Sequence, residues 1–286
     1  MSESESPIVV LDSGLGGLTV VRALRTALPS EHILYFGDTA RLPYGSKSPA
    51  TVTSFVGQII AYFRARRPKH VLIACNTATA LALRSVRESF PDLSISGVIE
   101  PGAKAAVEAA SANKHPCIGI IGTEATIRSR AYELAIHARR QRARLLLRAA
   151  PLLVPIIEEG RSESDPLVVL ALEQYLRPLL DRAIDVLVLG CTHYPILRGA
   201  IEKIVTHRVR VIDSAERCAQ DVARRLMDAG VVRAGPSAGT LKCFVTDDSP
   251  RFAALASRFL GARVDPPAWI SVDELQSISV GPPVRE

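Results

Sequence analysis

The chain has 286 residues, enough for one large domain or two modest domains with buried cores. Apolar residues make up 48% and charged residues 22%, and 35 basic against 29 acidic residues give a net charge of +6. This is the composition of an ordinary globular protein, and its dispersed basic residues indicate a mild preference for anions instead of a nucleic-acid-binding surface.

Targeting, membrane and metal signals are missing from the sequence. The N-terminal MSESESP has neither a basic region nor an apolar core, and no apolar stretch reaches the roughly 20 residues of a membrane span. The five cysteines are widely spaced, with no CxxC and no Cys/His ligand spacing. We therefore expect a reduced, cytoplasmic protein with no disulfide framework and no metal site.

Strand and helix patterns alternate along the chain. Short apolar runs predict strands at 8–11, 32–36, 71–74, 117–121, 144–148, 186–189 and 210–212. The segments between them predict helices at 17–28, 49–66, 78–90, 128–140, 166–182 and 196–205. This alternation favours parallel sheets flanked by helices, and the uniformly apolar strands indicate burial on both faces.

A coarse internal echo divides the chain. IVVLDSG resembles CIGIIGT, and VLIACNT resembles VLVLGCT, each as a strand followed by a turn of small residues. We predict an α/β fold of two similar parallel-sheet domains with a pseudo-twofold relation and the active site in the cleft between them. Residues 1–99 and 213–286 would form the first, discontinuous domain, and residues 100–212 the second. Within the returning segment, 235–239 is expected to be a loop and 280–286 a frayed end.

Two cysteines follow buried strands in near-identical settings. Cys75 lies in ACNT after VLI, and Cys191 lies in GCTHYP after VLVL. Open α/β sheets place their chemistry at such strand ends, and a following helix N-terminus favours a thiolate. Two equivalent acid/base groups suit stereoinversion at a carbon acid. His193 is either a proton partner of Cys191 or a structural histidine, and the remaining cysteines are read as packing residues: Cys117, Cys218 and Cys243.

Two turn-rich loops follow early strands. In DSGLGGLT the glycines let backbone N–H groups approach an anion, although the spacing is not GxGxxG. Asp12 or Ser13 is either a cap of a tight turn or, for Asp12, a neighbour of a reactive group. In GDTARLPYGS the backbone and the hydroxyls of Tyr44 and Ser46 could hold a carboxylate.

Two further segments have a structural and a functional interpretation. In PIIEEG the two carboxylates form either a solvated loop or, for one of them, an acid or base near Cys191. The arginine-rich run at 139–144 is expected to be a solvated helix face, with docking of nucleic acid or protein as the alternative.

An ordered set of segments resembles the glutamate racemases of the aspartate/glutamate racemase superfamily, from Ile8 to about Phe259. These segments are DSGLGGLTV, YFGDTARLPYGSKS, ACNTATA, GVIEPG, IGTEAT, VPIIEEG, LGCTHYP and IDS. The resemblance implies cofactor-independent interconversion of L- and D-glutamate, with D-glutamate feeding peptidoglycan synthesis. It implies that Cys75 acts on D-glutamate and Cys191 on L-glutamate.

The resemblance also implies the supporting residues and the partners. Asp12 would assist Cys75, and Glu158 and His193 would assist Cys191. The substrate would be held by Asp12, Ser13, Pro43, Tyr44, Gly45, Ser46, Asn76, Thr77, Thr123, Thr192 and His193. It further suggests a homodimer and a contact with DNA gyrase. Ala150 stands where the family often has a cysteine, the stretch after Gly261 matches weakly, and the N-terminus is too short for the activator site of some relatives.

Three alternative functions stay open at this point. Aspartate racemase uses the same two-cysteine chemistry on a shorter substrate. A cysteine hydrolase would use Cys191 as nucleophile and His193 as base, but it would leave Cys75 unexplained. A non-enzymatic role would use the positive charge to bind nucleic acid or a DNA-linked partner.

Overall fold

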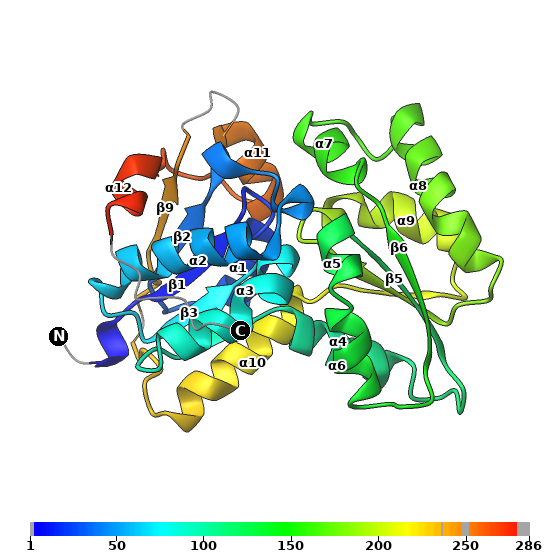
Figure 1. Cartoon of the computed structure of the whole chain (residues 1–286), viewed down its shortest axis with the longest axis horizontal. Coiled ribbons are helices and arrows are strands. Elements are labelled where there is room, and N and C mark those ends of the chain that lie inside the picture. The colour runs from blue at the N-terminus through cyan, green and yellow to red at the C-terminus, as the bar shows by residue number, and fades with distance from the viewer. Residues whose placement is uncertain (1–2, 236, 248–251, 279–286) are drawn as a thin grey trace.

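The computed structural model describes residues 3–235, 237–247 and 252–278, which form two α/β halves side by side (Figure 1). The first half is built on a six-stranded parallel sheet of order β10-β9-β2-β1-β3-β4. Its strands are β1 (Ile8–Asp12), β2 (Ile33–Gly37), β3 (His70–Ile73), β4 (Ile95–Gly97), β9 (Leu241–Val245) and β10 (Ala268–Trp269).

Helices cover both faces of this sheet. One apolar cluster joins the sheet to α1 (Leu18–Ala27), α10 (Ala215–Asp228) and α11 (Phe252–Leu260). A second cluster joins it to α2 (Pro49–Arg64), α3 (Asn76–Ser89) and α12 (Val272–Gln276). β1 is buried at every position, as a central parallel strand covered on both faces must be.

The second half carries a four-stranded parallel sheet of order β6-β5-β7-β8. Its strands are β5 (Cys117–Gly122), β6 (Arg144–Ala149), β7 (Val186–Gly190) and β8 (Arg210–Ile212). Its helices are α4 (Ile99–Ala109), α5 (Glu124–Arg128), α6 (Ala131–His137), α7 (Leu153–Glu158), α8 (Pro166–Leu180) and α9 (Arg198–Val205). The apolar cluster under α1 and α10 continues beneath α8 and α9, so the halves share one core.

The predicted α/β class with two parallel sheets is confirmed. The strands of the first sheet fall within 1–99 and 213–286 and those of the second within 100–212, while the domain boundaries themselves stay a prediction. The 235–239 segment is a loop at its described positions, and the expected frayed end at 280–286 lies outside the described residues. Among the described residues, no helix has the length and apolar character to cross a bilayer.

Two local predictions were wrong, and a third was right except at its first turn. The expected helix at 128–140 is two helices, because Arg130 between them has the left-handed backbone with φ of 56°. The arginine-rich run is therefore no helix face: it forms the turn into β6, where Arg139 pairs with Glu100 at 2.6 Å. The expected helix at 196–205 starts as a 3₁₀ turn, η4 (Tyr194–Leu197), which then continues as α9.

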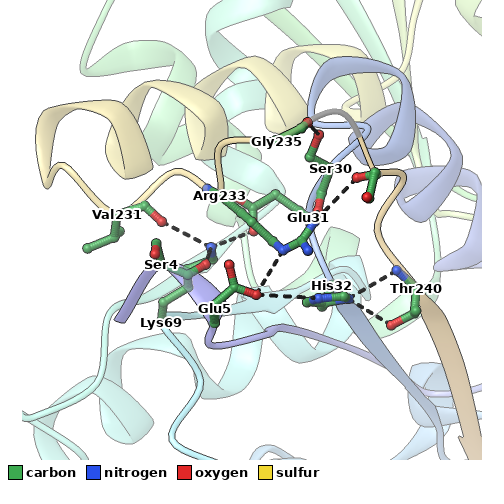
Figure 2. A network of polar contacts seen from close by, with 11 residues as sticks. Ser4, Glu5, Ser30, Glu31, His32, Lys69, Val231, Arg233, Gly235 and Thr240 are labelled. Atoms are coloured by element: carbon green, nitrogen blue, oxygen red, sulfur yellow. Dashed lines mark hydrogen bonds and ion pairs between the residues drawn. The ribbon is translucent and has the colours of Figure 1, made fainter. Parts of the chain in front are cut away.

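A buried polar network attaches the N-terminal segment to the first half (Figure 2). The Lys69 ammonium pairs with Glu31 at 2.5 Å and donates to the Ser4 carbonyl at 2.7 Å and the Val231 carbonyl at 3.0 Å. Arg233 adds a 3.0 Å ion pair with Glu5. Both members of the Lys69–Glu31 pair are buried, and Lys69 lies directly before β3, at the end of that strand opposite to Cys75.

Candidate functional site

Cys75 lies between the end of β3 and the start of α3. It is 6% exposed and caps the helix, because its sulfur accepts from the Ala78 N–H at 3.5 Å, and it donates to the Ser13 hydroxyl at 3.5 Å. Burial first, and then the nearby Asp12 carboxylate, raise the pKa of Cys75 to about 12. At neutral pH this group is therefore a thiol, despite the helix N-terminus that favours its anion.

Cys191 occupies the corresponding place at the end of β7 in the second half and is also 6% exposed. Its sulfur lies 3.9 Å from Nδ1 of His193, and Nε2 of His193 lies 3.0 Å from Oε1 of Glu158. Burial alone would lower the pKa of His193, but its contacts with Cys191 and Glu158 outweigh burial and raise that pKa to about 10. The structure thus sets an imidazolium beside this thiol, held from behind by a carboxylate.

The glycine-rich turn after β1 brings Asp12 to the junction of the two halves. Its carboxylate accepts from the Gly14 N–H at 3.0 Å and from the Thr192 hydroxyl at 3.4 Å. Burial raises the pKa of Asp12, and the positive charge of His193 offsets this only in part. A Cβ on Gly16 would lie 2.3 Å from the Thr192 hydroxyl oxygen, so only glycine lets the two halves approach this closely here.

The loop after β2 is organised around a buried carboxylate. Asp38 accepts from Nε of Arg41 at 2.8 Å, from the Thr246 hydroxyl at 2.9 Å and, through a short hydrogen bond, from the Tyr44 hydroxyl. The Tyr44 hydroxyl therefore donates its hydrogen to Asp38, and the backbone N–H groups of this loop are the donors that a ligand could use. Gly45 contacts the second half, where an added Cβ would lie 2.8 Å from Cβ of Thr123.

The first turn of α3 carries polar groups that face the second half. The hydroxyl of Thr77 lies 2.8 Å from that of Thr123 and 3.2 Å from that of Thr126. The Asn76 carbonyl oxygen accepts from the Tyr132 hydroxyl at 2.8 Å, while its buried amide nitrogen has no partner among the described residues. Buried amides of this kind usually complete their hydrogen bonds, so the free N–H group is a candidate ligand contact.

The two thiols are enclosed. A cavity of about 400 Å³ lies between the loop after β2, α7 and α11, and Leu42, Glu158 and Leu255 are among its lining residues. Neither thiol is among the residues that line this cavity, and each is 6% exposed.

Most of the residues predicted from the sequence lie at the facing strand ends, and two of them lie instead at the exposed surface. Asp12, Cys75, Cys191, His193 and Glu158 are linked by the contacts above. Pro43 and Ser46 are exposed, and the Ser46 hydroxyl bonds only the Pro43 carbonyl, at 3.4 Å, among the described residues.

Sequence reasoning missed four residues of this region: Asp38, Arg41, Thr126 and Tyr132. Asp38 and Arg41 stand inside the GDTARLPYGS segment, so their position in that loop was an available signal. The contacts of Thr126 and Tyr132 with α3 join different halves of the chain and have no local pattern.

Known proteins share both the sequence and the fold. Residues 17–222 match the family described as Asp/Glu/Hydantoin racemase. A glutamate racemase of Neisseria gonorrhoeae is 42% identical over 277 residues, 97% of this chain and 98% of that protein. One from Chlorobaculum tepidum is 42% identical over 261 residues, 91% of this chain and 94% of that protein.

The fold matches solved structures at similar coverage. A glutamate racemase from Francisella tularensis, crystallised in complex with D-glutamate, superposes with a TM-score of 0.87 at 35% identity, covering 94% of this chain and 99% of that one. An allantoin racemase from Klebsiella pneumoniae, at 20% identity and a TM-score of 0.55, shares the fold alone.

Proposed function

The chain belongs to the Asp/Glu/Hydantoin racemase family and is an enzyme of the glutamate racemase type, and from this premise we propose that it interconverts L- and D-glutamate through two thiols. The observation that carries the proposal is the pairing of two buried cysteines at corresponding strand ends of the two halves. The turn after β1 joins the two regions, because Ser13 accepts from the Cys75 thiol at 3.5 Å and Asp12 accepts at 3.4 Å from the hydroxyl of Thr192, the residue after Cys191.

The proton positions favour one resting form. The high pKa of Cys75 keeps that group protonated, and the imidazolium of His193 places a positive charge beside the Cys191 sulfur. Each direction of the reaction needs one sulfur as the proton acceptor and the other as the proton donor. The resting form is therefore ready to take a proton from the enantiomer whose α-hydrogen faces Cys191.

The reaction is a pair of proton transfers. With L-glutamate bound, the Cys191 thiolate removes the α-proton and the electron pair of the C–H bond passes to the α-carbon. The Cys75 thiol then delivers its proton to the opposite face, which gives D-glutamate and a Cys75 thiolate. The return reaction reverses these roles. Positioned acid and base groups of this kind contribute about 10²–10⁴-fold each, and enclosure between the two halves supplies orientation and excludes water.

Polar groups around the thiols would hold the two carboxylates and the amine of the substrate. The first turn of α3 offers the Asn76 amide and the Thr77 hydroxyl, and the Thr123 and Thr192 hydroxyls face them from the second half. The hydroxyl of Ser13 and the backbone of residues 43–46 complete this set. We assign the glutamate side-chain carboxylate to that backbone, because the Tyr44 hydroxyl is already committed to Asp38.

We further infer that the product D-glutamate serves peptidoglycan synthesis and that the enzyme works in the cytoplasm. Support comes from the family and from the five free cysteines, all buried, which suit a reducing compartment. A second copy of this chain and DNA gyrase, the partners that the family suggests, rest on the resemblance alone. Growth of a D-glutamate-requiring bacterium on this gene would support the cell-wall role, and no growth despite expressed active enzyme would contradict it.

The activity itself is tested by proton NMR of L- and D-glutamate in D₂O with the purified protein and no added cofactor. We expect loss of the α-proton signal together with decay of the circular dichroism of the amino acid. Aspartate, run alongside, should keep both signals. Exchange with aspartate alone would reassign the substrate, and no exchange with either amino acid would overturn the racemase proposal.

The hydrolase alternative has one structural feature in its favour, the contact chain from Cys191 through His193 to Glu158. It assigns no role to Cys75, whose burial and position match those of Cys191. Mass spectrometry after incubation with activated acyl substrates separates the two functions. An acyl group trapped on Cys191 would favour the hydrolase, and an unmodified protein that racemises glutamate would exclude it.

A further inference from the structure

The side-chain amide of Asn76 is held at one end and free at the other. Its oxygen accepts a 2.8 Å hydrogen bond from the Tyr132 hydroxyl, while its nitrogen is buried without a partner among the described residues. Asn76 is 2% exposed and follows Cys75 directly, so the free N–H group lies within the candidate active site. A buried donor left without a partner is unfavourable, and a bound carboxylate would supply the missing acceptor.

We propose that Tyr132 is a positioning residue, whose hydroxyl sets the orientation of the Asn76 amide so that its nitrogen donates to a substrate carboxylate. This rests on the proposed function, because it takes Asn76 as a contact of glutamate. The oxygen and nitrogen of an amide have nearly the same shape, so sterics alone would not select one orientation. A donor fixed against the oxygen does select it.

The Tyr132 hydroxyl is suited to be that fixed donor. The residue is 1% exposed, and burial raises its pKa, so the hydroxyl keeps its proton over the working pH range. Close packing holds the ring in place: a Cβ on Gly102 would lie 3.0 Å from the Tyr132 hydroxyl oxygen. An alanine at that position would press directly on the hydroxyl.

A residue with left-handed backbone precedes Tyr132. Arg130 has a φ of 56° and lies between α5 and α6, and Tyr132 is the second residue of α6. Non-glycine residues rarely adopt this conformation. Nε of Arg130 donates to Glu133 at 2.8 Å. This turn sets the start of α6 and with it the place of Tyr132 in the helix.

The two partners come from different halves of the molecule, Asn76 from α3 and Tyr132 from α6. The hydrogen bond therefore exists only when the halves are together. If the halves part to admit substrate, the amide is released, and closure sets it again. Tyr132 would thus couple closure of the halves to the assembly of a carboxylate contact.

The test is Tyr132→Phe, which removes the hydroxyl and keeps the ring. We expect KM for both enantiomers to rise about threefold to tenfold, the loss expected for one misdirected hydrogen bond, while kcat changes less than about twofold. The matched control is Tyr175→Phe, another buried tyrosine, whose hydroxyl accepts from the Leu152 N–H at 3.4 Å. This control should leave KM unchanged, and melting temperatures of all variants report any loss of fold.

A double-mutant cycle with Asn76→Ala separates positioning from packing. In the Asn76→Ala background, Tyr132→Phe should have no further effect on KM or on the calorimetric Kd for D-glutamate. An unchanged KM in Tyr132→Phe, or the same increase in both backgrounds, would overturn the positioning role even though the wild type racemises glutamate. A wild type without racemase activity would instead remove the proposed function, and this inference with it.

Discussion

The two thiols occupy equivalent places in the two halves but have opposite electrostatic surroundings. Cys75 ends β3 beside a carboxylate, and burial together with Asp12 raises its pKa to about 12. Cys191 ends β7 beside an imidazole whose pKa is raised to about 10 by Cys191 and Glu158, against the effect of burial. The Cys75 sulfur of the first half therefore carries a proton, and a cation lies beside the Cys191 sulfur of the second half.

A near-symmetric fold can thus serve a symmetric reaction with different charged groups beside its two thiols. L- and D-glutamate are enantiomers of equal free energy, so kcat/KM must be equal in the two directions for the wild type and for every variant. The two sides can still differ in kcat and in KM taken separately. A variant near Cys75 and a variant near Cys191 should therefore change the ratio of kcat from D-glutamate to kcat from L-glutamate in opposite directions. The following variants test this.

The largest effect is expected for the thiols themselves. Cys75→Ala or Cys191→Ala should lower racemisation by about 10²–10⁴-fold or more, because each removes the acid or base of one face. Any remaining α-proton exchange should be confined to one enantiomer, D-glutamate in Cys191→Ala and L-glutamate in Cys75→Ala, as NMR in D₂O would show. Cys117→Ala, which removes another buried thiol, is the control and should racemise normally. Near-normal racemisation by either active-site variant would end the two-thiol mechanism.

A smaller effect is expected for Asp12→Asn. The amide keeps the shape of the carboxylate but cannot accept the proton that Cys75 must give up before it acts on D-glutamate, so the side that handles D-glutamate should suffer most. We expect kcat from D-glutamate to fall on the order of a hundredfold, and kcat from L-glutamate to fall less. Steady-state circular dichroism from both enantiomers gives the two values. An equal fall in both kcat values would contradict the assignment of Asp12 to one side.

Glu158→Gln should act on the other side and more weakly. Without that carboxylate the pKa of His193 falls, and each unit changes the ratio of imidazolium to imidazole about tenfold. We expect the alkaline limb of the pH profile of kcat from L-glutamate to move to lower pH, with kcat falling roughly tenfold at pH values above the lowered pKa. Direct NMR titration of the His193 ring should show the same shift, and an unchanged limb would separate Glu158 from the proton chemistry.

The contact between His193 and Glu158 should also affect how the free energy of unfolding depends on pH. Since the folded pKa of His193 lies above its unfolded value, its contribution to stability is complete below about pH 6.5. That contribution is lost as pH rises through about 10. The wild type should therefore lose more of its unfolding free energy than Glu158→Gln over this alkaline range. Chemical denaturation at several pH values measures the difference.

The smallest effect on racemisation is expected for Lys69→Met, in the network of Figure 2 at the opposite end of β3 from Cys75. Removing one member of the buried Lys69–Glu31 pair leaves a buried charge unpaired and should cost about 3–5 kcal/mol of unfolding free energy. The folded enzyme should keep its kcat. Replacing both residues, as Lys69→Met with Glu31→Leu, should recover much of the stability, and no recovery would show that the pair is more than an electrostatic contact.

The sequence predicted the architecture well because strand burial is a local property. Apolar runs of three to five residues that alternate with helical segments identified all seven expected strands within one or two residues of their observed bounds. The same runs located Cys75 and Cys191 at strand ends. Local patterns failed at Arg130, where a positive φ divides a helix that composition alone would continue.

By itself, then, the sequence determined the α/β class, the two thiols at strand ends and the resemblance to a racemase family. Only the tertiary structure decided which groups surround each thiol, because those contacts join residues far apart in the chain. His193 meets Glu158 across 35 positions, Tyr132 meets Asn76 across 56, and Thr192 meets Asp12 across 180. Such contacts depend on how whole elements pack, and the different surroundings of two similar motifs follow from that packing.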